Sequence, residues 1–346
     1  MRILVIKPSS IGDVLHTFPS VALIRSAIPD AVIDWVVNDT LSEVARLCPG
    51  IMRIIPFPRK GLCNLKKDMS FVKELRKDSY DVAIDYQGLF RSGLMTKICR
   101  AKKKAGFAHA REGAPLFYGI RCIIHDMHTH AVDKNIKLTR FALGIPESIP
   151  VPPPAIEMPR EPLEEIERLI PQIKDSPLLA VCFSSRWHSK NWSLDFISKC
   201  IDETYRRMTD LRIVLIGSKD DKETGDRLAA LCKAHMPMNL AGSTSFSQLA
   251  ALLSRASAML TVDSGPMHLA AAIGVPCIAL FGATDDVLTG PYGDSGFHKI
   301  IRTKCDKAPC FMRDCPMHVN CADDVSVAET TDAILEQINR QQGGKL

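Results

Sequence analysis

The chain has 346 residues, of which 46% are hydrophobic and 24% charged, and its net charge is +5. This length is about twice that of a typical domain of roughly 150 residues, so it predicts two domains, each with its own core. The composition excludes a disordered, fibrous or integral membrane chain. The longest nearly apolar stretch, residues 269–283, contains Pro276 and is shorter than the ~20 residues that span a bilayer.

The predicted elements alternate between strands and helices. In the first half, strands are expected at 3–6, 32–37, 53–56 and 81–85, and helices at 14–27, 40–47 and 70–77. In the second half, strands are expected at 178–183, 212–216, 258–262 and 277–281, and helices at 193–208, 222–235, 247–254 and 267–273. This alternation is typical of βαβ units and predicts two doubly wound α/β domains with parallel sheets. A ligand is then expected between the carboxyl ends of their strands.

Proline marks the boundary between the two halves. Nine of the 22 prolines lie between residues 146 and 177, which indicates a stiff linker. We therefore expect an N-terminal domain at 1–150, a linker at 151–177 and a C-terminal domain at 178–346.

The two halves differ in charge. Residues 1–150 contain 23 Lys and Arg against 14 Asp and Glu, whereas residues 151–346 contain 21 against 25. The first half is therefore expected to meet an acidic partner, with a solvated basic face as the alternative.

The amino terminus predicts a cytoplasmic protein. The apolar run 3–6 is too short for an export signal and indicates a buried first strand. In a chain that is not exported, the twelve cysteines are expected to be free core thiols or, where they cluster, a metal site.

The first candidate site is the loop Lys7-Pro-Ser-Ser-Ile-Gly-Asp13. It lacks both the G-x-G-x-x-G dinucleotide fingerprint and the G-x-x-x-x-G-K-[ST] phosphate loop, so neither NAD nor an ATPase site is indicated. Asp13 stands at a helix start, just after a strand. A carboxylate there is either a helix cap or a catalytic group, and the residues alone leave both open.

The strongest local motif is Asp263-Ser-Gly-Pro-Met-His268, at the end of a buried strand. Gly265 suits a turn, and Pro266 suits the first position of a helix. The N–H groups of such a helix start, together with the Ser264 hydroxyl, predict a diphosphate site. His268 is either a ligand-binding residue or an ordinary polar residue satisfied within the fold.

A third segment, residues 183–192, follows the first strand of the second half. Ser184 and Ser185 offer hydroxyls, and Lys190 offers a point charge suited to phosphate oxygens. A solvated loop is the alternative for this segment.

Together these motifs resemble glycosyltransferase family nine, the ADP-heptose:lipopolysaccharide heptosyltransferases. The resemblance covers nearly the whole chain and is carried by residues 7–19, 34–37, 85–89, 190–192, 263–268 and 281–284. The front segment, with Asp34-Trp-Val-Val37, looks most like heptosyltransferase I, which adds the first heptose to Kdo.

The resemblance implies a GT-B fold, two Rossmann-like domains facing across a cleft, with the acceptor on the first domain and the donor on the second. It implies that Asp13 is the general base and that Lys190 meets the donor diphosphate. Asp220 is assigned to the ribose, although the neighbouring Asp221 leaves that alignment open. The C-terminal helix is a candidate to pack back on the N-terminal domain. The implied donor-binding residues are Ser9, Ser10, Gly12, Ser184, Ser185, Lys190, Asp220, Thr244, Asp263, Ser264, Gly265, Pro266, Met267 and His268.

An acceptor rich in carboxylates and phosphates, Kdo-bearing lipid A, would account for the basic first half. The acceptor-binding residues expected on this basis are Arg59, Lys60, Gln87, Arg91 and Arg111. Basic patches of this size also suit docking on the anionic inner leaflet, at about 1 kcal/mol per residue near the surface. Basic residues interleaved with aromatics are not visible, so no nucleic acid partner is expected.

Four cysteines, Cys305, Cys310, Cys315 and Cys321, lie within 17 residues and could bring four thiolates to one metal ion. Their spacing lacks the C-x-x-C pairs of zinc ribbons, and the resemblance includes family members with similar cysteines that need no metal. We therefore expect no metal, with a thiolate cluster as the alternative.

The sequence thus predicts an inverting glycosyltransferase that moves heptose from ADP-heptose to a Kdo residue of the lipopolysaccharide inner core without a cofactor. It is expected to be cytoplasmic and peripheral on the inner membrane. Addition of the second heptose or another inner-core sugar is the alternative. A distant alternative is a thiolate-metal interaction protein whose nucleotide site is vestigial.

Overall fold

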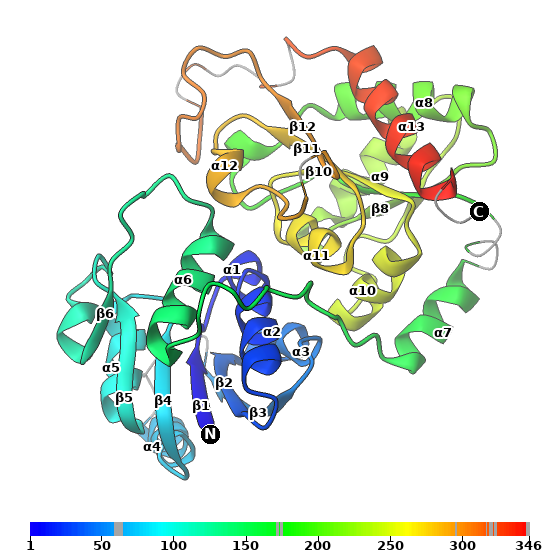
Figure 1. The fold of residues 1–346 in the computed structure, drawn as a ribbon. Coiled ribbons are helices and arrows are strands. Elements are labelled where there is room, and N and C mark those ends of the chain that lie inside the picture. The colour runs from blue at the N-terminus through cyan, green and yellow to red at the C-terminus, as the bar shows by residue number, and fades with distance from the viewer. Residues whose placement is uncertain are drawn as a thin grey trace. The chain divides into compact units, whose positions relative to one another are not determined.

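The computed structural model describes residues 1–58, 65–170, 173, 176–294, 296–315, 317, 321 and 324–343. The chain divides into two compact units, Met1–Glu157 and Met158–Leu346. Each unit is a parallel sheet flanked by helices (Figure 1), which confirms the expected α/β class with two doubly wound domains.

The first unit has, within the described residues, a six-stranded sheet in the order β3-β2-β1-β4-β5-β6, and its neighbouring strands pair in parallel. Its strands are β1 (Arg2–Ile6), β2 (Val32–Asn38), β3 (Ile51–Phe57), β4 (Ser79–Asp85), β5 (Arg100–Phe107) and β6 (Ile120–Cys122). Its helices are α1 (Ile11–Leu15), α2 (Phe18–Ala27), α3 (Ser42–Arg46), α4 (Leu65–Leu75), α5 (Phe90–Ile98) and α6 (Ala131–Leu143).

Both faces of β1 are buried, as its apolar run predicts. Leu4 and Ile6 point to one face and pack with Phe71 of α4 and Met95 of α5. Successive side chains of a strand point to opposite faces, so the intervening residues serve the other face of the sheet.

Strand order reverses between β1 and β4, which lie side by side at the centre of the first sheet. The loops that follow these two strands leave the sheet at the same edge and turn to opposite faces. Such a point opens a crevice at the carboxyl ends of the strands and is the usual ligand site of an open α/β sheet.

The second unit repeats this plan with the order β12-β11-β10-β7-β8-β9 among its described residues. Its strands are β7 (Leu178–Cys182), β8 (Arg212–Ile216), β9 (Met238–Asn239), β10 (Ala258–Val262), β11 (Cys277–Phe281) and β12 (Lys299–Arg302). Its helices are α7 (Arg160–Leu169), α8 (Leu194–Arg207), α9 (Lys222–Leu231), α10 (Phe246–Arg255), α11 (Gly265–Ile273), α12 (Asp286–Thr289) and α13 (Val327–Gly343). Here the order reverses between β7 and β10, so the loops at 183–192 and 263–265 leave the sheet side by side.

The expected helix 14–27 is two helices. The first ends at Leu15, and Pro19 occupies the first turn of α2. Proline has no N–H to continue the hydrogen-bond ladder, and its ring clashes with the carbonyl four residues earlier, so the helix breaks there.

The segment 151–177, expected to be a linker, contains the helix α7, which packs on α10 of the second unit. Glu165 accepts a hydrogen bond of 2.7 Å from Gln248, and Glu167 forms an ion pair of 2.6 Å with Arg255. Buried Ile166 anchors the helix. This helix was not predicted, because the prolines concentrated on its flanks indicated a linker.

The C-terminal helix α13 packs against α8 and the strands β10 and β11 of its own unit, and it buries Ile334 and Ile338 in that core. Among the described residues, every helix is too short or too polar to cross a bilayer.

Candidate functional site

The loop after β1 holds a lysine–carboxylate pair. Lys7 Nζ lies 3.0 Å from Asp13 Oδ1 and donates a hydrogen bond of 3.1 Å to the carbonyl of Tyr86, just after β4. The Lys7 side chain is 7% exposed, whereas the Asp13 side chain is 42% exposed. The lysine therefore lies behind a carboxylate that solvent, and hence a ligand, can reach.

The second carboxylate oxygen of Asp13 belongs to a helix cap. Asp13 Oδ2 accepts hydrogen bonds from the Ser10 backbone N–H at 2.9 Å and from the Ser10 hydroxyl at 2.8 Å. Ser10 is the N-cap of α1, and Asp13 is the third helical residue of a capping box. The two alternatives for Asp13 are thus not exclusive: one oxygen caps α1, and the other faces Lys7.

These contacts control the ionisation of Asp13. Burial alone would raise the pKa of the Asp13 carboxyl, but the Lys7 ammonium, the Ser10 hydrogen bonds and nearby His16 hold that pKa well below its ordinary value. The ring of His16 lies 5.3 Å from that of His130 in an edge arrangement. Asp13 is therefore ionised throughout the physiological pH range.

The loop after β4 supports the loop after β1. Asp85, fully buried at the end of β4, accepts hydrogen bonds from Gln87 N at 2.8 Å, Gly88 N at 3.1 Å and Tyr118 Oη at 2.6 Å. Burial raises the pKa of Asp85, and these hydrogen bonds oppose the rise. The Gln87 side chain in turn accepts a hydrogen bond of 3.1 Å from Ser9 N. Gln87, expected to bind acceptor, thus lies at the switch point.

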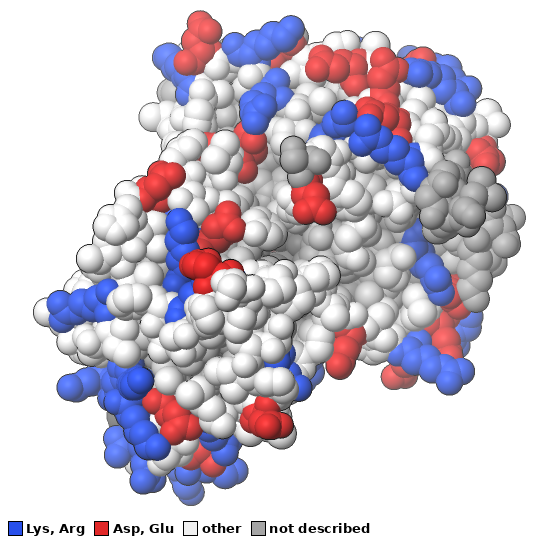
Figure 2. Space-filling model, in the orientation of Figure 1, with Lys and Arg blue, Asp and Glu red and all other residues white. Residues whose placement is uncertain are grey.

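Two of the expected acceptor-binding cations border this loop. Arg91 is exposed in the first turn of α5, with Cζ 5.8 Å from the Phe57 ring centroid, and Arg111 N donates a hydrogen bond of 2.9 Å to the Gly88 carbonyl. Figure 2 shows Lys and Arg gathered over the part of the first unit that holds α4, α5 and β5. Arg59 and Lys60 lie outside the described residues.

In the second unit, the loops after β7 and β10 share another lysine–carboxylate pair. Lys190 Nζ lies 2.6 Å from Asp263 Oδ2, and the Thr284 hydroxyl donates a 2.6 Å hydrogen bond to the same oxygen. His268 Nε2 lies 4.0 Å from Asp263 Oδ1. Here the carboxylate is 6% exposed and the lysine 16% exposed, so the acid lies behind the cation.

The helix α11 begins as its motif predicts, with Ser264 as N-cap and Pro266 in the first turn. The side chains of two residues that were predicted to bind donor make contacts within the unit. The Ser264 hydroxyl lies 3.3 Å from Thr261 Oγ1 and 3.4 Å from Cys182 Sγ, so it is engaged within the sheet. The Met267 side chain is 0% exposed and packs in the core, so only its backbone could face a ligand. The half-exposed Gly265 is open to one.

The loop after β7 is held by its own hydrogen bonds. Ser184 and Ser185 are half-buried, and Ser185 N donates a 2.6 Å hydrogen bond to the Asn191 side chain. Trp187 places its ring centroid 4.8 Å from Lys190 Nζ, within cation–π distance. Ser9, Ser10 and Gly12, also expected to bind donor, lie in the first unit around Asp13.

The structure brings Asp220 and Thr244 to adjoining loops. Gly242, two residues before Thr244, has φ +72°, and a Cβ there would lie 2.7 Å from Lys219 Cα, so only glycine allows this close approach. Asp221 accepts hydrogen bonds from Ser218 N at 2.7 Å and the Ser218 hydroxyl. Asp220 is exposed, so of the two acids it is the one open to a ligand.

The four clustered cysteines lie on a loop that is closed at its ends. We call the described residues within 303–324 the cysteine loop; Lys304 N and the Thr303 hydroxyl donate to the Asp324 carboxylate at 2.6 and 3.2 Å. Cys305, Cys310, Cys315 and Cys321 are half-buried free thiols. Burial, followed by the charges of the other three, raises the pKa of Cys321 to about 11. Across the described residues, no group of three or more His, Cys, Asp or Glu side chains is arranged to hold a metal ion.

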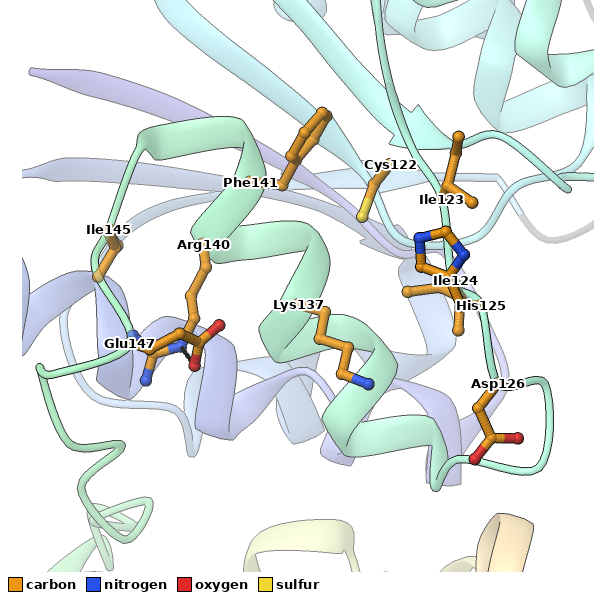
Figure 3. A pocket seen from close by; sticks show the side chains of 10 residues that line it. All are labelled: Cys122, Ile123, Ile124, His125, Asp126, Lys137, Arg140, Phe141, Ile145 and Glu147. Carbon is orange, nitrogen blue, oxygen red and sulfur yellow. Dashed lines mark ion pairs between the residues drawn. The ribbon is translucent and has the colours of Figure 1, made fainter.

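A groove of about 490 Å³ lies elsewhere in the first unit, between α6 and the segment after β6. Figure 3 shows Arg140 extending from α6 toward Glu147, with which it forms an ion pair of 3.3 Å, while Ile123, His125 and Asp126 line the segment across from the helix. The groove contains none of the residues that the motifs predicted.

Sequence reasoning missed several residues of both sites: Lys7, Asp85, Trp187 and Thr284. Each stands inside or next to a quoted motif, so the signal was present. Their roles could not be predicted, because residues from other strands decide whether a lysine lies behind an aspartate or a threonine lies beside an aspartate.

Comparison with known proteins now identifies the family. The model of glycosyltransferase family 9 (heptosyltransferase) matches residues 69–320, so the chain belongs to this family and is a glycosyltransferase. Lipopolysaccharide heptosyltransferase 1 of Pseudomonas aeruginosa is 32% identical over 328 residues, which cover 91% of this chain and 87% of that protein.

Other members of the family match as well. Heptosyltransferase 1 of Escherichia coli K12 is 30% identical over 85% of this chain and 91% of its own length. Heptosyltransferases 3 and 2 of the same organism are 28% and 25% identical, over 82% and 87% of this chain and 83% and 90% of their own.

The solved structure of E. coli heptosyltransferase WaaC with ADP has a TM-score of 0.78 at 26% identity, over 97% of this chain and all of that chain. The structure of E. coli ADP-heptose lps heptosyltransferase II, at 21% identity and a TM-score of 0.79 over 99% of this chain and 100% of that one, agrees in fold. The GT-B architecture expected from the resemblance is thereby confirmed.

Proposed function

We propose that this enzyme transfers heptose from ADP-heptose to a Kdo residue of the lipopolysaccharide inner core, with inversion at the anomeric carbon. The relatives are named lipopolysaccharide heptosyltransferases, and a structural neighbour was solved with ADP. The observation that carries the proposal is that each unit holds a lysine–carboxylate pair at its own switch point. One presents an exposed, ionised carboxylate, Asp13, and the other presents the ammonium of Lys190.

Donor binding is assigned to the second unit. The diphosphate would take Lys190 as its cation, while Thr284 keeps its hydrogen bond to Asp263 and so holds that buried carboxylate in place. As the anomeric bond breaks, ADP leaves with the bonding electrons, and a fixed ammonium stabilises the charge that develops on it. Thr244 and the exposed Asp220 are assigned to the adenosine end of the donor.

Acceptor binding and the general base are assigned to the first unit. The acceptor hydroxyl attacks the anomeric carbon from the face opposite ADP and must lose its proton as the new bond forms. Asp13 is the group that accepts it, since its side chain is 42% exposed and the carboxylate is ionised at neutral pH. Gln87, Arg91 and Arg111 border the loop on which Asp13 depends, and are assigned to the acidic acceptor.

The finer points of the proposal are the first heptose as product, the cytoplasm as compartment and the inner leaflet as docking surface. The exposed basic residues over α4, α5 and β5 support binding to an anionic membrane or acceptor (Figure 2). Addition of the second heptose is the alternative, because heptosyltransferase 2 also matches this chain.

The test is turnover of ADP-heptose with two defined acceptors, one ending in Kdo and one already carrying the first heptose. We expect transfer to the Kdo acceptor, in the presence of EDTA, with release of ADP. Transfer to the heptosylated acceptor alone would establish the alternative. Loss of activity with EDTA and its return with a divalent cation would overturn the metal-free mechanism.

A further inference from the structure

The Lys190 and Asp263 pair in the second unit does not by itself balance the charge of a diphosphate. Lys190 and Asp263 lie 2.6 Å apart and together carry no net charge. A nucleoside diphosphate linked to a sugar carries two negative charges, so an approaching diphosphate needs at least one more cation or a metal ion. A second fixed cation near Lys190 would meet this need.

Such a cation lies on the cysteine loop. Arg313 Cζ is 5.7 Å from the centroid of the Trp187 ring, and Lys190 Nζ is 4.8 Å from the same centroid. The two cations therefore share one indole, on which both are within range of a cation–π contact. The Arg313 side chain is exposed, so its guanidinium is available to a ligand.

The backbone fixes Arg313 in this place. Ser189 N donates a 3.0 Å hydrogen bond to the Arg313 carbonyl, and the Ser189 hydroxyl donates to the carbonyl of Met312. On the other side, Phe311 N donates a 2.7 Å hydrogen bond to the Ala283 carbonyl, next to Thr284. The cysteine loop is thus attached to Ser189 and Ala283, the chain neighbours of Lys190 and Thr284.

We propose that Arg313 is a second diphosphate-binding cation of the donor site, presented by the cysteine loop. The inference rests on the proposed function, because it takes ADP-linked sugar as the ligand. A planar guanidinium can give two parallel hydrogen bonds to phosphate oxygens, which a lysine cannot do. The cysteine loop then acts as a support that carries a binding residue to the phosphates.

The test is calorimetric titration of the full chain with ADP and, separately, with adenosine. We expect Arg313→Gln to weaken ADP binding about five- to twentyfold and to leave adenosine binding unchanged, because only ADP carries the diphosphate. Arg313→Lys is expected to lose less ADP affinity than Arg313→Gln. Added salt should reduce the difference in ADP affinity between Arg313→Gln and the wild type, since Arg313 is exposed.

The matched control is Lys307→Gln, which removes one exposed positive charge from the same loop. ADP affinity equal in Arg313→Gln and Lys307→Gln would overturn the inference, as would an equal loss of ADP and adenosine affinity. A wild-type chain that binds no ADP would overturn the donor assignment as well. Normal ADP binding by the wild type with no effect of Arg313→Gln would overturn only the inference.

Discussion

The two switch points use the same pair of residues in opposite orientation. In the first unit, Lys7 is 7% exposed behind an Asp13 side chain that is 42% exposed. In the second unit, Asp263 is 6% exposed behind a Lys190 side chain that is 16% exposed. A ligand therefore meets a carboxylate at one edge and an ammonium at the other.

The comparison teaches that the buried partner decides what the exposed partner can do. A buried ammonium keeps an accessible carboxylate ionised, and so able to accept a proton, while it also lowers the proton affinity of that carboxylate. A buried carboxylate, held by the Thr284 hydroxyl, keeps an accessible ammonium in one place for an anion. The same two residue types thus supply a base in one unit and a cation in the other.

The largest effect is expected for Asp13→Asn. The amide keeps an oxygen for the Ser10 cap but loses basicity, so kcat should fall by about 10² to 10⁴ while the Kd for ADP stays near wild type. Steady-state kinetics and calorimetry check this. Asp221→Asn, which makes the same change in the capping box beside Ser218, shows the thermal shift that this change causes by itself. Near-normal turnover of Asp13→Asn would reduce Asp13 to a helix cap.

Lys190→Met should cost about 2 to 4 kcal/mol of transition-state stabilisation, seen as a fall in kcat/KM for the donor. It should also lower the Tm, because Asp263 stays buried without its cation. Adding Asp263→Asn should recover Tm but not kcat/KM. Lys199→Met, which breaks an exposed ion pair of 2.6 Å with Asp195, is the control. If the double variant regained activity, the cation would not act on the donor.

Lys7→Met should change the pH dependence more than the rate at neutral pH. Lys7 lowers the pKa of Asp13, so the wild type keeps its base ionised as the pH falls. Removing the ammonium should move the acid limb of kcat/KM upward by about 1 to 3 pH units. Lys102→Met, which breaks the exposed pair with Asp81, should leave the profile in place. An unmoved acid limb in Lys7→Met would separate Lys7 from the ionisation of Asp13.

The contribution of Asp13 to the free energy of unfolding also depends on pH, and it falls as the pH is lowered. Its folded-state pKa lies below the unfolded value, so the contribution is present above the unfolded pKa and is lost as the pH falls through the folded one. Thermal melts of the wild type and Lys7→Met at neutral and acid pH measure this loss as a fall in Tm.

The smallest effect is expected at the edge of the first unit. Arg91→Gln with Arg111→Gln should raise the acceptor KM a few-fold and leave the KM for the donor unchanged, since both arginines are exposed. The effect should shrink as salt is added. Equal changes in both KM values would remove these arginines from the acceptor site.

The four central strands of the second unit could be predicted from the sequence almost residue by residue, whereas the edge strands β9 and β12 were not predicted. Strands 212–216, 258–262 and 277–281 have the bounds that their apolar runs predict. Both faces of a central parallel strand are buried, so the run itself carries the information. The strand β5 was missed, because Arg100-Ala-Lys-Lys-Lys104 reads as a basic patch until neighbouring strands pair with it.

The functional site, like the fold, could be predicted from the sequence only in part. The sequence by itself determined the chemistry-bearing loops, because each follows a strand, and strand order then places their ends together. The expected helix at 14–27 overlooked the break at Pro19, although that break is a local property of proline. The sequence did not indicate which member of each lysine–aspartate pair would be buried.

Only the tertiary structure decided that Lys7 lies behind Asp13, that Asp263 lies behind Lys190, and that Arg313 shares the Trp187 ring. The reason is physical. Burial, and with it the ionisation and accessibility of a charged group, depends on what the rest of the chain packs around it, and residues 123 positions apart, such as Ser189 and Met312, make that environment.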